Sequence, residues 1–221
     1  MSLPAHRWIS PEEYLAFEAK ALEKHEYVDG VVYPRGDPDH PLDPAVVLGL
    51  RPEPQVAMAG STLRHSTIKV NLTIAIGALL RNTPCRLYES DVRVRPGSAG
   101  YLYPDLLVVC GEQGDDLEIE VNNPTLVIEI LSPSTEGFDR GEKFDHYAVA
   151  DSLQQYVLVS TRRQGTDVFT RDDGRWVLER FAPPDHLHLA SIGVDLDFAE
   201  IYHNVQWSLL LQPNDTTRDR E

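Results

Sequence analysis

The segment PTLVIEILSPSTEGFDRGEK, residues 124–143, decides the fold prediction because it places one carboxylate, Glu129, inside an otherwise apolar strand. Burying an ionised carboxylate is costly unless it is paired or binds a metal. A second acid, Asp105, heads another apolar run, YPDLLVVC, and Lys143 lies where a helix is expected. Adjacent strands could therefore bring both carboxylates to one end of a sheet.

The strands around this segment predict the central sheet. We expect strands at 87–95, 104–110 and 125–131, the last two apolar enough to be buried on both faces. A helix at about 139–150 and a strand at 154–160 complete a strand-helix-strand unit. The prediction is a mixed α/β (α+β) fold in which helices flank a central mixed β-sheet.

The rest of the chain is divided by cap, turn and periodicity signals. They predict a helix from Ser10 to about Leu22, a hairpin turning at Asp29-Gly30, a long helix from Ser61 to before Pro84, a terminal meander at 168–170, 175–181 and 186–189, and a short helix near 198–202. We predict a single domain over residues 1–211, with an irregular, proline-rich surface insertion at about 34–56 and a flexible tail at 212–221.

The formal net charge of -15 argues against a nucleic-acid partner, because phosphate backbones are usually bound by Lys and Arg that replace counterions. Any DNA contact would need a local basic patch. Arg93 and Arg95 share one face of an alternating run, and Arg162 and Arg163 lie in a predicted turn. The alternative, that these are solvated surface charges, is equally compatible with the sequence.

Cys85 and Cys110 are far apart in the chain and match no metal-ligand spacing, which predicts reduced thiols in a cytoplasmic protein. The N-terminal residues lack the apolar core of a signal peptide, and the longest apolar segment is too short to span a bilayer. We therefore expect no membrane association.

Asp105 and Glu129 supply the oxygen ligands that Mg²⁺ or Mn²⁺ prefers. A bound metal could activate water and neutralise charge on a phosphodiester, and Lys143 could position the attacking water or stabilise transition-state charge. The structural alternative is that Asp105 ends a strand, Glu129 pairs with a basic residue and Lys143 is a solvated helix residue. Spacing alone does not separate the two hypotheses.

Six blocks of the chain, in order from about residue 10 to 160, resemble the Uma2-like (DUF820) family of putative restriction endonucleases, whose fold is similar to the PD-(D/E)xK nuclease core. The blocks are PEEYLAFE, HEYVDG, MAGSTLRHSTIKVNL, YPDLLVV, LVIEILSPST and DRGEKFDHYAVADSLQQYVLV. The resemblance implies that Asp105 and Glu129 hold the metal and that Lys143 is the catalytic lysine. In the general nuclease pattern the lysine follows the glutamate by two residues, where this chain has Leu131.

The resemblance also implies roles for Glu26, which could extend the metal shell, and His65, which could orient a phosphate or relay a proton. His186 and His188 alternate on one strand face and could bind a metal. Without a nearby carboxylate or cysteine we interpret them as exposed edge residues.

The sequence leads to one main functional hypothesis and two alternatives. The main one is a Mg²⁺-dependent DNA endonuclease, for which a homodimer is expected. The alternatives are a non-catalytic interaction or scaffold protein on a nuclease fold, and a metal-dependent hydrolase of a small phosphorylated or nucleotide substrate.

Overall fold

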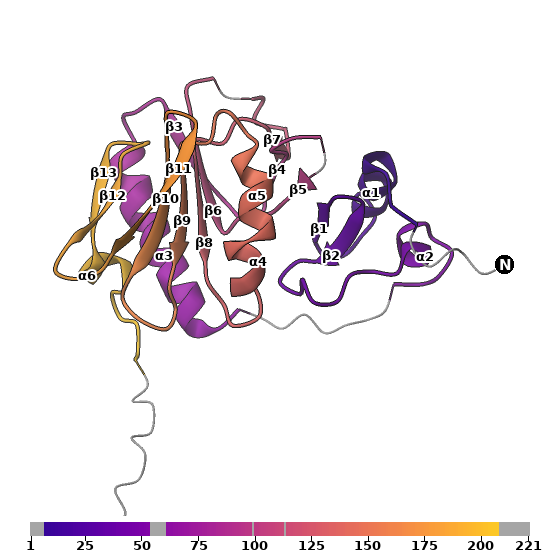
Figure 1. Cartoon of the computed structure of the whole chain (residues 1–221), viewed down its shortest axis with the longest axis horizontal. Coiled ribbons are helices and arrows are strands. Elements are labelled where there is room, and N and C mark those ends of the chain that lie inside the picture. Colours follow the sequence, from indigo (N-terminus) through magenta and orange to yellow (C-terminus); the bar gives the residue numbers. More distant parts are fainter. Residues whose placement is uncertain (1–6, 54–60, 99, 113, 208–221) are drawn as a thin grey trace, which may run out of the picture.

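A six-stranded mixed sheet forms the centre of the computed structural model, which describes residues 7–53, 61–98, 100–112 and 114–207 (Figure 1). In spatial order its strands are β11 (Arg175–Phe181), β10 (Thr166–Asp172), β9 (Gln155–Val159), β8 (Leu126–Ile130), β6 (Leu106–Cys110) and β3 (Cys85–Glu89). Strands β8 and β9 are parallel and the other neighbours are antiparallel. The predicted mixed fold with a central mixed sheet is confirmed.

Helices cover the two faces of this sheet (Figure 1). Helix α3 (Leu63–Leu80) packs on one face, together with the ribbon of β12 (His186–Leu189) and β13 (Val194–Asp197) and helix α6 (Phe198–Ile201). Helices α4 (Glu136–Arg140) and α5 (Glu142–Ala148) lie on the other face. Side chains alternate along β8, so Ile128 and Ile130 face α3 whereas Val127 faces α5. Glu129, in phase with Val127, therefore points toward α4 and α5.

Helix α3 follows the predicted periodicity. Thr62 caps its N-terminus by accepting a hydrogen bond from the backbone N–H of His65. Ile68, Leu72 and Ile76 recur every four residues, are fully buried and lie against the sheet. The cap and the packed stripe together fix the position of the first turn, which carries His65.

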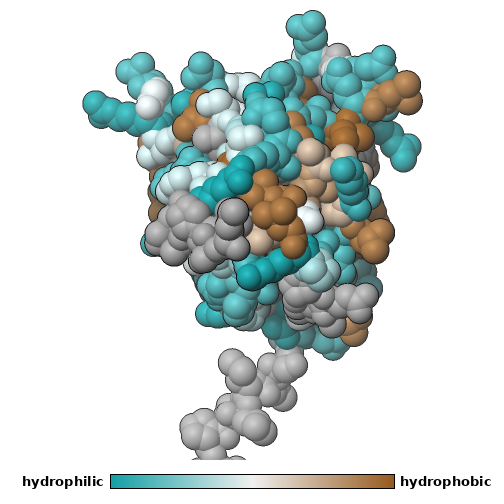
Figure 2. Space-filling view, turned by 90° about the vertical axis from the view of Figure 1, so that its right-hand side faces the viewer, coloured by the Kyte–Doolittle hydropathy of each residue, from teal (hydrophilic) through white to brown (hydrophobic). Residues whose placement is uncertain are grey.

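A smaller unit lies beside α5 and contains the N-terminal elements (Figure 1). It comprises α1 (Pro11–Glu18) and a three-stranded sheet of β2 (Val31–Pro34), β1 (His25–Val28) and β5 (Gly100–Tyr101). Asp29 and Gly30 both have positive φ angles, of 46° and 85°, as the predicted two-residue hairpin turn requires. Figure 2 shows the face that this unit presents: it is mostly hydrophilic, and hydrophobic residues gather near its centre.

The proline-rich segment is more ordered than predicted. It contains helix α2 (Pro44–Val47), which begins at the cap residue Asp43 and buries Ala45, Val46 and Val47. The expectation of an irregular surface segment was therefore wrong here: three consecutive apolar residues after the cap give the segment a packing face. Residues 54–56 of the insertion, and the predicted tail at 212–221, lie outside the described residues.

Three other elements differ from the prediction. The expected helix at 139–150 is divided at Gly141, which lies between α4 and α5. The strand expected at 87–95 becomes β3 and a separate β4 (Arg93–Val94), which pairs with β7 (Glu120–Val121). The last strand of the predicted meander, β12, leaves the main sheet and pairs with β13 instead.

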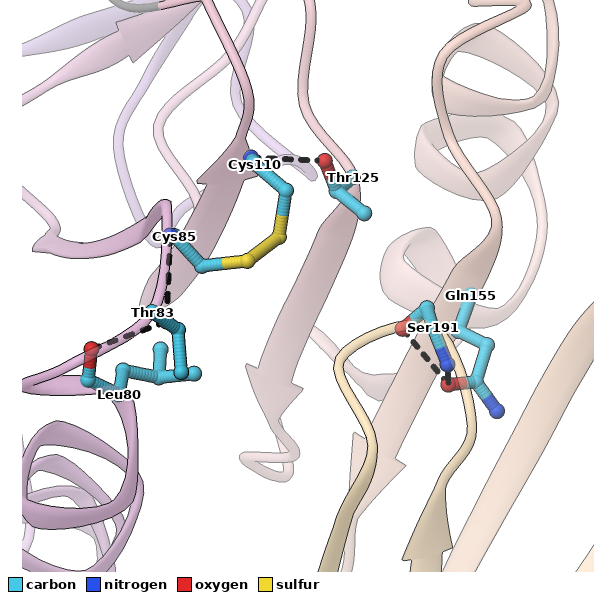
Figure 3. Close-up of a disulfide and its surroundings, with 7 residues drawn as sticks. All are labelled: Leu80, Thr83, Cys85, Cys110, Thr125, Gln155 and Ser191. Carbon is cyan, nitrogen blue, oxygen red and sulfur yellow. Dashed lines mark hydrogen bonds between the residues drawn. A yellow bond between two sulfur atoms is a disulfide. The ribbon is translucent and has the colours of Figure 1, made fainter.

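Cys85 and Cys110 form a disulfide, which corrects the prediction of reduced thiols (Figure 3). They are 25 residues apart in sequence, but the antiparallel register of β3 and β6 places them directly opposite each other. A register contact of this kind depends on which strands become neighbours, so their separation in the chain did not reveal it. The cysteines therefore no longer support the predicted cytoplasmic location. Within the described part of the chain, no helix is long and apolar enough to cross a membrane.

Candidate functional site

The two predicted carboxylates meet where β6 and β8 lie side by side. The register pairs Leu106 with Ile128, so Asp105, one residue earlier, lies opposite Glu129. The backbone N–H of Asp105 donates to Oε2 of Glu129 at 3.2 Å, and the N–H of Ile130 donates to Oδ2 of Asp105 at 2.9 Å. These reciprocal bonds fix both carboxylates at one end of the sheet.

Lys143 reaches this pair from the start of α5. Its Nζ lies 3.0 Å from Oε1 of Glu129 and 3.0 Å from Oε1 of Glu26, and only 5% of the residue is exposed. The structural alternative predicted a solvated Lys143, which is wrong. It also predicted that Glu129 pairs with a basic residue, which is correct. The chain has Leu131 where the general nuclease pattern has its lysine, and the lysine that contacts Glu129 comes from another element.

Glu26 holds the other side of this lysine. It lies on β1 and is buried, and its Oε1 also accepts the backbone N–H of Tyr103 at 3.0 Å. The Tyr103 carbonyl in turn accepts a hydrogen bond from Lys143 Nζ at 3.4 Å. Glu26 therefore connects the small N-terminal unit to the main sheet through the buried ammonium group.

Asp105 has two further partners at its outer side. His65 Nε2 lies 3.1 Å from Oδ2, and a guanidinium nitrogen of Arg35 lies 3.3 Å from Oδ1. Burial alone raises the pKa of Asp105, but the His65 hydrogen bond, the Arg35 charge and the Ile130 N–H outweigh it and lower that pKa to about 2. Asp105 is thus an ionised carboxylate near neutral pH.

The pKa values of Glu129 and Lys143 are shifted in the opposite direction. Burial raises the pKa of Glu129 well above its usual value, and Asp139, Asp105 and Glu26 add to the effect against the opposing charge of Lys143. Burial by itself lowers the pKa of Lys143, but Glu129, Glu26 and Asp139 more than reverse this and raise it. Lys143 is therefore a permanent cation held among carboxylates.

Asp139 is a member of this cluster that the sequence analysis missed. It is buried on α4, and its Oδ1 lies 3.7 Å from Lys143 Nζ. The available signal was the four-residue spacing between Asp139 and Lys143, which places two side chains on one helix face. Arg35 was missed as well, because it lies in the segment interpreted as an irregular insertion.

Asp139 gives the protein a predicted pH dependence. Burial raises its pKa to about 6 from an ordinary value of 3.8, with the like charges of Glu26 and Asp105 adding to it, against Lys143 and a Thr135 hydrogen bond. A raised pKa means that folding favours the protonated form, so this contribution to stability is complete below about pH 4 and is lost as the pH rises through 6.

We therefore expect Asp139→Asn to reduce the fall in the free energy of unfolding between about pH 4 and pH 7, to which Glu129 still contributes through its own raised pKa. Urea unfolding of the wild type and the variant, without divalent metal, measures this difference. Parallel stability curves across that range would contradict the prediction. Asp105 does not interfere, because its lowered pKa affects stability only below about pH 4.

The cluster is rich in carboxylate oxygens, the type of ligand that a hard divalent cation prefers. The cluster has four carboxylates and two strong cations: Glu26, Asp105, Glu129 and Asp139 against Lys143 and Arg35. A bound divalent cation would favour the ionised forms of Glu129 and Asp139, which burial disfavours. Among the described residues no group of three or more His, Cys, Asp or Glu side chains is placed to hold a metal. Mg²⁺ is commonly held by one or two carboxylates plus water and substrate oxygens, which Asp105 and Glu129 could provide.

Other candidates from the sequence lie outside this cluster. Arg93 is buried, donates two hydrogen bonds to Glu120 and lies over the ring of Tyr101, so both readings, an exposed basic patch and a solvated surface charge, are wrong for this residue. His186 and His188 are exposed, as expected, but each pairs with an aspartate of β13, at 2.7 and 2.6 Å. The expectation that no carboxylate lies near them was wrong, since β13 was not predicted.

A pocket of about 720 Å³ lies elsewhere, near β7, and is a poor candidate for the same chemistry. Its acidic lining residues are Glu112, Asp115, Asp116, Glu118 and Glu120. Like charges on this scale repel a phosphate backbone, so the pocket does not compete with the Lys143 cluster as a nucleic-acid site.

Residues 53–199 match the family model Uma2, described as "Putative restriction endonuclease". The chain belongs to the Uma2 family. The matched range includes His65, Asp105, Glu129 and Lys143, whereas Glu26 precedes it. The Uma2 assignment thus covers the sheet and α5 but not the β1 carboxylate that holds the lysine from the other side.

Two proteins of Synechocystis sp. are similar to this Uma2 chain. The uncharacterised protein slr1290 is 34% identical over 199 residues, covering 89% of this chain and 93% of its own length. The uncharacterised protein sll1609 is 27% identical over 174 residues, covering 77% and 85%.

A solved structure shares the fold. It is the crystal structure of a putative nuclease belonging to DUF820 from Anabaena variabilis, with a TM-score of 0.63 and 19% sequence identity, and the match covers 88% of this chain and 97% of that one. At this identity the likeness supports the Uma2 fold and does not assign an activity.

Proposed function

We propose that this Uma2 protein is a divalent-metal-dependent nuclease that hydrolyses phosphodiester bonds in DNA. The observation that carries the proposal is the position of Lys143 Nζ, 3.0 Å from Glu129, whose other oxygen accepts the N–H of Asp105. Two carboxylates and a lysine from three separate elements thus meet in one buried cluster. The family description, and the description of the Anabaena protein as a putative nuclease, support the same class of activity.

In this proposal Asp105 and Glu129 hold Mg²⁺ or Mn²⁺. The metal would supply charge neutralisation on the scissile phosphate and a lower pKa for a water molecule. Asp105 is suited to this role because its low pKa keeps the carboxylate ionised near neutral pH. The backbone N–H groups of Asp105 and Ile130 keep both carboxylates oriented without a bound ligand.

Lys143 supplies a fixed positive charge beside Glu129, which can orient the attacking water and stabilise charge that develops on the phosphate. Glu26 positions the ammonium group from the opposite side. His65 directs Nε2 at Asp105, and among the described residues its buried Nδ1 has no hydrogen-bond partner. His65 would therefore act by holding the Asp105 carboxylate in place, because the buried Nδ1 atom has no access to a phosphate.

Cleavage assays with purified protein test the proposal. Supercoiled plasmid, linear duplex and single-stranded DNA are incubated with Mg²⁺, Mn²⁺ or EDTA, and we expect products only with metal. Calorimetric titration with Mn²⁺ should show binding that Asp105→Asn abolishes together with cleavage. Asp116→Asn, which removes a carboxylate that pairs with Arg86 outside the cluster, is the control. A wild type that neither binds metal nor cleaves DNA with either ion would overturn the proposal.

A further inference from the structure

The end of the sheet at which Glu129 lies continues into a loop that carries two arginines. Strands β8 and β9 are parallel and pair Ile130 with Val159, so the chain segments that follow them emerge together. The hydroxyl of Thr161 donates to the carbonyl of Leu131 at 2.7 Å, which attaches the loop after β9 to the segment after β8. Arg162 and Arg163 follow directly, at the same edge as the carboxylate cluster.

Four arginines gather at this edge, and we call them the arginine edge: Arg140 on α4, Arg162 and Arg163 in the loop, and Arg180 on β11. A single buried carboxylate organises three of them. Asp167 lies 2.6 Å from Arg140, 3.4 Å from Arg180 and 4.0 Å from Arg163. These three guanidinium groups are therefore held by the carboxylate of Asp167, which is almost inaccessible to solvent.

The arginine edge carries a surplus of positive charge. Within the described ranges, its ion pairs involve two carboxylates, Asp167 and Glu136, against four guanidinium groups. The side chains of Arg162, Arg163 and Arg180 are 67%, 56% and 70% exposed. The Arg162–Glu136 contact at 3.5 Å is a surface ion pair that solvent screens, so Arg162 can turn to another anion at little cost. In a chain with a net charge of -15, such a local surplus identifies a surface for an anionic partner.

A neighbouring arginine connects this edge to the cluster. Arg64 donates to the carbonyl of Thr161 at 2.9 Å, and the next residue, His65, contacts Asp105. Figure 1 shows the first turn of α3, the loop between β9 and β10 and helix α4 at the same end of the sheet. A polyanion lying on the arginine edge would therefore reach the carboxylate cluster without crossing the acidic pocket near β7.

We propose that the arginine edge binds the phosphate backbone of duplex DNA and leads one strand to the Asp105 and Glu129 site. The proposal rests on the proposed function for its choice of substrate. Guanidinium groups match phosphate through paired N–H donors, and several of them along one edge suit a chain of regularly spaced phosphates better than a single small anion. The acidic protein would thus bind DNA through one local surface.

Binding to a fluorescent DNA duplex tests this inference separately from catalysis. Anisotropy is measured across a salt series, with Mg²⁺ present, in a Glu129→Gln background that cannot cleave. The variant Arg162→Ala/Arg163→Ala removes two exposed contacts without touching the core. Arg175→Ala is the matched control, because Arg175 is an exposed arginine of the same hairpin, about 17 Å from Arg180 along β11.

We expect the double variant to reduce the slope of log affinity against log salt by about two and to weaken binding about a hundredfold at 0.1 M salt. Arg180→Ala should reduce the slope by about one, and Arg175→Ala should change neither quantity. Affinity and slope that stay unchanged in the double variant and in Arg180→Ala, or no duplex binding in the parent, would overturn the inference. If the wild type cleaves DNA but the arginine variants bind the duplex as well as the parent does, the nuclease proposal stands and this inference fails. Arginine-dependent binding without cleavage would support this surface and refute the nuclease.

Discussion

Replacing Lys143 with methionine will destabilise the protein by about 3–5 kcal/mol at neutral pH, because removing one partner of a buried ion pair leaves uncompensated charge. Glu26 and Glu129 each lose a cation at 3.0 Å, and neither has access to solvent that could replace it. Urea unfolding at pH 7 in EDTA measures the change. The loss should shrink as the pH falls, since protonation neutralises the stranded carboxylates.

Lys69→Met is the control for this experiment. Lys69 also pairs with a glutamate, Glu89, at 3.8 Å, but that glutamate is half exposed. A surface pair of this kind contributes about 0–1 kcal/mol. If the two substitutions lower the free energy of unfolding equally, the burial of the Lys143 ion pairs does not increase the loss, and the prediction is contradicted.

Replacing Glu129 with glutamine will abolish DNA cleavage, with an expected loss on the order of a thousandfold, the size found when one group that stabilises transition-state charge is removed. Stability should not fall, because the substitution removes one negative charge from a cluster with more carboxylates than cations. Single-turnover cleavage and urea unfolding measure the two effects. Lost activity with retained stability distinguishes a metal ligand from a purely structural ion-pair partner.

Glu26→Gln is the matched comparison, since Glu26 lies at the same 3.0 Å from Lys143 but has no contact with Asp105. We expect this variant to retain Mn²⁺ binding while losing part of its cleavage rate, because only the positioning of Lys143 changes. If Glu26→Gln also loses the metal, Glu26 belongs to the metal shell. If Glu129→Gln keeps full activity, the assigned role of Glu129 is wrong.

Much of the fold could be predicted because local signals and core packing agree. The Asp29-Gly30 turn, the apolar stripe of α3 and the two doubly buried strands all encode their conformation within a few residues. The proline-rich segment was less predictable, because Val47 packs in a cluster with Tyr27 and Val32 of the hairpin, which are 15 or more residues away in the chain. The Cys85–Cys110 disulfide was missed for the related reason that it needs the register of two strands.

The features of the candidate site fall into the same two groups, those that the sequence predicts and those that depend on the folded chain. The amino-acid sequence was enough to predict that Glu129 enters a buried strand and needs a partner, because an unpaired ionised carboxylate is too costly in an apolar layer. It also named Asp105 and Lys143, through their flanking residues and the family resemblance. The folded structure was needed to show that Lys143 lies between Glu129 and Glu26, and that Asp139 and Arg35 join the cluster. These contacts join residues tens of positions apart, so strand register and helix packing fix their distances and local sequence does not.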